Sequence, residues 1–196
     1  MSTTIGVFIF DGAEELDWVG PYEVLGTWAQ LWPGDEVQVF TLSVTGAEVR
    51  GAKGLRVRPD HSCATAPPMD VLVYPGGVGT RAHLEDERFL NWVRGLAKDK
   101  VLMTSVCTGS LVYAAAGLLD GRPATTHWGS LDHLGSLGEN IEVRPDDRFV
   151  DDGDIVTGAG VSAGIDMALH LVARLHSRER AAEVRRAIQY DPNPPV

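Results

Sequence analysis

Val101-Leu-Met-Thr-Ser-Val-Cys-Thr-Gly-Ser-Leu-Val-Tyr-Ala-Ala-Ala-Gly117 begins as a short apolar run and continues directly as an alanine-rich helical pattern. The change falls at Cys107, which predicts that this cysteine lies on a tight turn between a buried strand and a helix. A nucleophile elbow has the pattern small-x-nucleophile-x-Gly, because only small neighbours let the backbone bend so sharply. Here Ser105 and Gly109 are the small neighbours of Cys107. We therefore predict a reactive cysteine at the carboxyl end of a strand, where open α/β sheets bind their ligands.

Two interpretations of Cys107 follow from its own properties. A free cysteine is often a small, inert core residue. Its position at the start of a helix favours the functional interpretation, because the helix would direct the positive end of its dipole at the sulfur. We therefore expect the helix to favour the thiolate over the thiol. The other cysteine, Cys63, lies in a segment rich in turn residues and is interpreted as incidental.

Strand patterns alternate with helical patterns along the rest of the chain. The predicted strands cover residues 4–10, 36–43, 70–75 and 121–126, with small hairpins over 49–59 and 149–157. The predicted helices cover residues 21–31, 89–97 and 161–175, and Pro21 lies in the first turn of the first one. This alternation predicts an α/β fold, a doubly wound parallel sheet with helices on both faces. Because no linker or internal repeat is visible, we expect a single domain over residues 1–196.

Composition and charge exclude several classes of protein. A formal net charge of -10 would repel the phosphates of nucleic acids, so we predict no nucleic-acid partner. The sequence has no apolar stretch of 18 residues and no signal-peptide pattern, so we predict no membrane span and a cytoplasmic location. The two cysteines lie far apart, and no histidines have the spacing of a metal site. We expect the partner to be a small-molecule substrate.

Three further segments carry candidate site residues. Asp17 lies just before or at the start of the first predicted helix, where an aspartate also serves as an N-terminal cap. Gly76 and Gly77 follow the strand over 70–75, and their N–H groups can face an oxyanion because glycine permits close backbone approach. His127 ends the strand over 121–126, where it could reach the same rim as Cys107, although a lone histidine is usually structural.

Taken together, these segments resemble the DJ-1/PfpI superfamily, the flavodoxin-like relatives of class I glutamine amidotransferases. The resemblance is carried by Gly12-Ala-Glu-Glu-Leu-Asp17, Tyr74-Pro-Gly-Gly77, Ser105-Val-Cys-Thr-Gly109 and Thr125-Thr-His-Trp128. It implies a flavodoxin-like sheet, a homodimer, Cys107 as the reactive cysteine and Asp17 as the acid that touches it.

The residue after the cysteine distinguishes branches of this superfamily. Peptidase and amidotransferase-like members usually have histidine there, whereas this chain has Thr108, so a Cys-His proteolytic mechanism is disfavoured. Leu16-Asp17-x-x-Gly20-Pro21, Gly160-Val-Ser-Ala-Gly-Ile-Asp166 and the ending Tyr190-Asp-Pro-x-Pro-Pro resemble the isocyanide hydratase branch. The same sheet domain occurs at the front of some AraC-type regulators, but no helix-turn-helix follows here, so we expect an enzyme.

The resemblance implies a mechanism in which the Cys107 thiolate attacks the terminal carbon of an isocyanide. Asp17 would transfer protons, and beside a negative sulfur it should hold its own proton more tightly than a free aspartic acid. The N–H groups of Gly77 and Thr108 would stabilise the anion, and the Thr108 hydroxyl would position water.

The organic group of the substrate and the competing functions are less well specified. Trp18 and Trp128 are candidate apolar walls for that group, and either can equally be a core residue. The chemistry needs neither a metal nor an organic cofactor. Two other functions stay open: a glyoxalase or deglycase acting on 2-oxoaldehydes with the same Cys107 and Asp17, and a redox sensor in which Cys107 is oxidised to a sulfinate.

Overall fold

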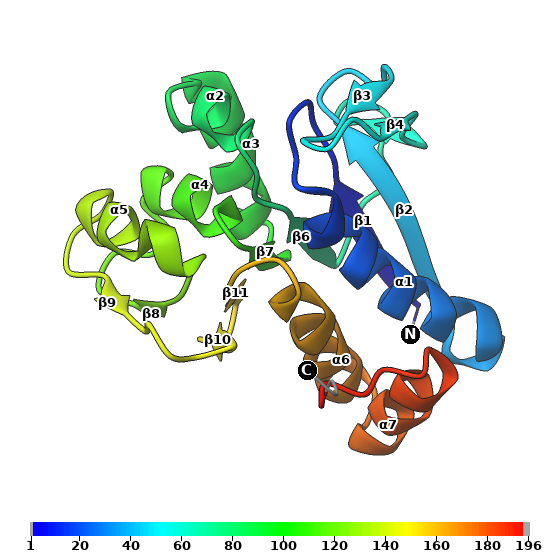
Figure 1. Ribbon diagram of the computed structural model, residues 1–196. Coiled ribbons are helices and arrows are strands. Elements are labelled where there is room, and N and C mark those ends of the chain that lie inside the picture. Colours follow the sequence, from blue (N-terminus) through cyan, green and yellow to red (C-terminus); the bar gives the residue numbers. More distant parts are fainter. Residues whose placement is uncertain (1, 194–196) are drawn as a thin grey trace.

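A seven-stranded sheet forms the centre of the computed structural model, which describes residues 2–193 (Figure 1). In spatial order the strands are β10 (Phe149–Asp151), β11 (Ile155–Gly158), β7 (Leu102–Val106), β6 (Val71–Tyr74), β1 (Thr3–Phe8), β2 (Val37–Ser43) and β5 (His61–Ser62). All neighbouring pairs are parallel except β10–β11, which is an antiparallel hairpin at one edge. The predicted α/β architecture, with its mostly parallel sheet, is confirmed.

Helices cover the two faces of this sheet in two groups. One group consists of α1 (Glu15–Leu31), α6 (Ala163–Leu175) and α7 (Arg178–Ala187), and the other of α2 (Thr80–Leu84), α3 (Glu87–Lys98), α4 (Gly109–Ala115) and α5 (Leu131–Ser136). Two short sheets lie outside the main one: the hairpin of β3 (Val49–Arg50) with β4 (Arg56–Val57), and β8 (Pro123–Ala124) beside β9 (Glu142–Val143). Figure 1 shows the hairpin near the start of α1 and the second sheet beside α5.

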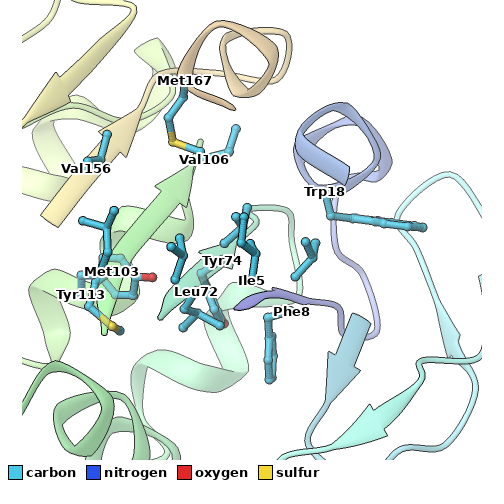
Figure 2. Close-up of a cluster of buried hydrophobic side chains, with 14 of the residues drawn as sticks. Ile5, Phe8, Trp18, Leu72, Tyr74, Met103, Val106, Tyr113, Val156 and Met167 are labelled. Atoms are coloured by element: carbon cyan, nitrogen blue, oxygen red, sulfur yellow. The ribbon is translucent and has the colours of Figure 1, made fainter. Parts of the chain in front are cut away.

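The core lies between the helices and the central strands. Every residue of β6 is completely buried, as the unbroken apolar run Val71-Leu-Val-Tyr74 predicts for a strand covered on both faces. Leu72 of this strand packs with Met103 of β7 and Tyr113 of α4 in one cluster (Figure 2). This packing fixes the ends of β6 and β7 side by side, and those ends carry the glycine turn and Cys107.

The first helix begins earlier than the sequence pattern indicated. We expected Pro21 in its first turn, but α1 begins at Glu15 and Pro21 lies in its interior. Proline has no N–H, so it cannot donate to the carbonyl of Asp17 four residues earlier. A tertiary contact sets the true start: the N–H of Glu14 donates to the carbonyl of Gly76 (2.9 Å). Asp17 is thereby placed inside the first helical turn.

Smaller differences have local causes. The helix predicted from residue 89 begins at Glu87, because the Asp86 side chain accepts the N–H groups of Arg88 and Phe89. The strand predicted over 121–126 is only the two-residue β8, and it joins β9 rather than the main sheet. The edge strand β5 and the short helix α2 were not predicted. Pro194 and Pro195 of the terminal motif lie outside the described part of the chain.

Across residues 2–193, no helix is both long enough and apolar enough to cross a membrane.

Candidate active site

Cys107 occupies the turn between β7 and α4, as predicted. Its φ is +56°, a left-handed conformation that costs free energy for a residue with a side chain. The turn is held on both sides of the residue. The N–H of Cys107 donates to the carbonyls of Gly158 and Ala159 (3.0 Å each), and its own carbonyl accepts the hydroxyl of Thr126 (2.8 Å). The neighbouring strand β11 therefore helps to impose the strained conformation of the nucleophile.

Gly109 is required by close packing rather than by its own backbone angles. A Cβ at this position would lie 2.5 Å from the carbonyl oxygen of Tyr74 at the end of β6. Ser105, the other small neighbour of the elbow, is completely buried. The small-x-nucleophile-x-Gly pattern thus corresponds to a true elbow, in which the turn after β7 presses against the end of β6.

Asp17 is the acid beside the cysteine. Its side chain is completely buried, and its Oδ2 accepts the N–H of Gly76 (2.9 Å). The Cys107 thiol donates to the same carboxylate group. Burial raises the pKa of Asp17 from 3.8 to about 7, while the hydrogen bonds from Gly76 and Cys107 limit that rise. The increase in the pKa of this carboxyl has the predicted direction.

The thiol behaves differently from the prediction made for it. Burial raises the pKa of Cys107 from 9.0 to about 12, and the negative charge of Asp17 adds to the increase. The N–H groups of Thr108 and Val161 hydrogen-bond the sulfur and act in the opposite direction. Loss of solvation outweighs these donors, so the expectation that the following helix makes the thiolate the favoured form is wrong. At neutral pH the coupled pair is therefore losing its first proton, chiefly from Asp17, while the Cys107 thiol keeps its own.

Val161 is a site residue that the sequence reasoning missed. It has φ +46°, which is rare for a β-branched residue, and its N–H is one of the two that reach the Cys107 sulfur. The available signal was Gly158-Ala-Gly160, a small-residue turn after a strand that pairs with β7. Parallel strands end at the same edge, so this turn had to lie near the elbow.

Gly76, Gly77 and Thr108 meet at this edge, but not all in the expected roles. The N–H of Gly77 donates to Thr108 Oγ1 (2.9 Å), so it is committed within the protein and is not a free donor for an anion. The same Thr108 hydroxyl lies 3.4 Å from the carbonyl of Gly77, so it is not free to position water. A Cβ on Gly76 would lie 2.9 Å from Asp17 Oδ2, so the absence of a side chain there allows the acid to approach.

The aromatic and histidine candidates are divided between rim and core. The ring of His127 packs on Gly160, where a Cβ would lie 2.5 Å from its Cδ2, so it stands beside the loop that holds Val161. The Trp128 side chain is 79% exposed, so it is not a wall of an enclosed pocket. Trp18 belongs to the buried core cluster, and Figure 2 shows its ring projecting from α1.

Residues 2–193 contain no group of three or more histidine, cysteine, aspartate or glutamate side chains placed to hold a metal ion. The groups that meet at the site are the cysteine, the adjacent carboxyl and the backbone N–H groups around them.

Comparison with protein families agrees with this geometry. The model of the DJ-1/PfpI family matches residues 3–174. The chain belongs to the DJ-1/PfpI family. Among solved structures of this family, a ThiJ/PfpI family protein from Pseudomonas syringae superposes with a TM-score of 0.85 at 32% identity, covering 100% of this chain and 78% of that one.

Proteins with different names and functions are similar to this chain. The isonitrile hydratase of Pseudomonas putida is 40% identical over 195 residues, which is 100% of this chain and 82% of that protein. The HTH-type transcriptional regulator GbdR of Pseudomonas aeruginosa is 30% identical, and this chain spans about half (51%) of its length. The Parkinson disease protein 7 homolog of Danio rerio is 28% identical over 91% of this chain.

Proposed function

We propose that this protein hydrates isocyanides to N-substituted formamides, with Cys107 as the nucleophile and Asp17 as the proton-transfer group. The observation that carries the proposal is the coupled Cys107–Asp17 pair, buried on an elbow with two N–H groups directed at the sulfur. Similarity to an isonitrile hydratase along the whole chain supports the same assignment. "Isonitrile" and "isocyanide" are two words for the same functional group, R–N≡C.

The first step joins the sulfur to the substrate. With one proton shared by the pair, Asp17 takes the thiol proton as the Cys107 sulfur bonds to the terminal carbon of R–N≡C. Asp17 then returns that proton to the same carbon, which gives the thioimidate R–N=CH–S–Cys107. The N–H groups of Thr108 and Val161 stabilise the sulfur while it is negative, because they hydrogen-bond its thiolate form.

The second step releases the product. Water adds to the thioimidate carbon while Asp17 accepts one of its protons, and the C–S bond breaks as nitrogen gains a proton. The products are R–NH–CHO and the Cys107 thiol, so the two steps together consume one isocyanide and one water. A carboxyl with a pKa of about 7 suits this work, because it is present in both protonation states near neutral pH.

A paired turnover assay tests this function. Purified protein and Cys107→Ala are each given cyclohexyl isocyanide or methylglyoxal, with Cys63→Ala as the matched cysteine control. Formamide formation that requires Cys107 and survives loss of Cys63 is the expected result. Turnover of methylglyoxal alone would assign a glyoxalase or deglycase. Rapid peroxide oxidation of Cys107 without either turnover would assign a redox sensor.

We also propose that the chain works as a homodimer. The support is a set of exposed apolar side chains on α1, namely Leu16, Tyr22 and Leu31, which are 38–54% exposed. Light scattering coupled to size exclusion should give twice the mass of the 21.1 kDa chain. The mass of a single chain at micromolar concentration would contradict this proposal.

A further inference from the structure

The β3–β4 hairpin is fastened by its backbone to the segment that leads into α1. The N–H of Gly12 donates to the carbonyl of Arg50, and the N–H of Ala52 donates to the carbonyl of Ala13 (2.8 Å each). The N–H of Arg50 donates to Asp11 Oδ1 (2.7 Å). Figure 1 shows the hairpin beside this segment. These bonds hold the hairpin in one place relative to the first turn of α1, which carries the acid of the site.

Glu15 completes the attachment through its side chain. Its Oε1 accepts the backbone N–H of Lys53 (2.6 Å) and approaches that of Leu55 (3.4 Å). A Cβ on Gly51 would lie 2.6 Å from the same oxygen, so only glycine leaves room for this carboxylate. The hairpin turn is therefore held through the backbone N–H of Lys53, independently of the Lys53 side chain.

The Lys53 side chain instead extends to Glu14, the residue at the N-cap of α1. Its Nζ donates to Glu14 Oε2 (2.6 Å), and the Lys53 side chain stays 69% exposed. The N–H of Glu14 donates to the carbonyl of Gly76, and the N–H of Gly76 donates to Asp17 (2.9 Å each). A single residue, Gly76, thus lies between the backbone of Glu14 and the buried acid.

An exposed ion pair of this kind contributes little to stability, and the hairpin is already held without it. The remaining effect of the ion pair is its electrostatic field at the buried carboxyl of Asp17. Within the described chain, the charged and titratable groups that act on Asp17 are Cys107 from the elbow, Glu14 from the same helix and Lys53 from the hairpin. The Glu14 carboxylate raises the pKa of Asp17, and the Lys53 ammonium lowers it.

We propose that Lys53 and Glu14 are positioning residues with opposite effects on how readily the Asp17–Cys107 pair loses its first proton. Lys53 stabilises the singly ionised, reactive form of the pair, whereas Glu14 opposes that form and holds the Lys53 ammonium in place. The hairpin thereby acts on the chemistry of a site that it does not enter. The inference gives this proton a role in the proposed hydration and so rests on that function, but the proton affinity itself can be measured without any substrate.

The test follows the reactivity of Cys107 and the ionisation of Asp17 directly. Cys63→Ser is the background, so that Cys107 is the only thiol. The rate of Cys107 alkylation by iodoacetamide is measured from pH 5 to pH 9, together with the ¹³C shift of the Asp17 carboxyl, in Lys53→Met and in Glu14→Gln. Lys98→Met, an exposed lysine at the end of α3, is the matched control.

Opposite shifts are expected from the two variants. Lys53→Met should raise the pH midpoint of both the Cys107 alkylation rate and the Asp17 carboxyl shift by about 0.3–0.5 unit, and Glu14→Gln should lower it by a similar amount. A shift of this size is expected from a nearby charge that solvent screens. Lys98→Met should leave it unchanged. Shifts in one common direction, or no shift in either variant, would overturn the inference. Opposite shifts in a protein that hydrates no isocyanide would support the inference and refute the proposed function.

Discussion

Replacing Asp17 by asparagine should abolish turnover and at the same time stabilise the fold. The acid is completely buried, and its pKa rises from 3.8 to about 7, mainly because burial disfavours the charged form. Asparagine keeps an oxygen that can accept the N–H of Gly76, but it never ionises. The variant therefore retains the local hydrogen bond and loses both the proton-transfer group and the cost of a buried charge.

The size of the stability gain depends on pH, and its sign follows from linkage. A pKa that is higher in the folded state means that the contribution of Asp17 to stability is complete below about pH 4 and is lost as the pH rises towards 7. At about 1.4 kcal/mol per pKa unit, the full loss is about 4 kcal/mol. Between pH 5 and pH 8 the wild-type protein should lose about 2.5 kcal/mol through this group, and Asp17→Asn should lose none of it.

Urea unfolding of both proteins at pH 5 and pH 8 measures this difference. Asp132→Asn is the matched control, because Asp132 is also in the first turn of a helix but is exposed. The stability advantage of Asp17→Asn over wild type should be about 2.5 kcal/mol larger at pH 8 than at pH 5, and Asp132→Asn should show no such difference. An advantage that is equal at the two pH values, or larger at pH 5, would refute a raised pKa at Asp17.

Three further predictions concern the elbow and its acid. Gly109→Ala should destabilise the fold by more than about 2 kcal/mol in urea unfolding, because its Cβ would lie 2.5 Å from the Tyr74 carbonyl, whereas unchanged stability would contradict that close approach. Thr126→Val should lower the free energy of unfolding by about 1–3 kcal/mol and should also lower kcat, because it removes the 2.8 Å hydrogen bond to the Cys107 carbonyl. Wild-type stability together with wild-type kcat would show that this hydrogen bond is dispensable. For wild type, kcat/KM for an isocyanide should fall about tenfold per pH unit below pH 7, because the pair must have lost one proton, and a flat profile between pH 5 and pH 7 would exclude Asp17 as the titrating group.

Much of the site was predictable because it depends on local pattern and on one property of parallel sheets. The apolar run before Cys107, the small residues around it and the glycines after β6 each mark the end of a strand. Parallel strands that are neighbours end at the same edge, so these features had to converge there. The edge hairpin was predictable in the same way, because Asp152-Gly153 is a turn signal between two short strands.

Roles that depend on which atoms meet were not predictable. The N–H of Gly77 was expected to face a ligand, yet the side chain of Thr108 takes it. One of the two N–H groups that reach the sulfur comes from Val161, and a valine in the sequence gives no sign that its backbone will be left-handed. The start of α1 also escaped prediction, because a hydrogen bond from Glu14 to Gly76, 62 positions further along the chain, outweighs the helix-start signal of Pro21.

The sequence by itself determined the α/β class, the position of the elbow and the identity of its nucleophile, because strand and helix periods and small-residue turns are properties of neighbouring residues. Only the tertiary structure decided the protonation of the site. The pKa values of Asp17 and Cys107 both rise because of burial, and burial is produced by every segment packed around them. The sequence predicts a helix whose dipole lowers the pKa of the Cys107 thiol. It does not predict the loss of water around the sulfur, which raises that pKa by more.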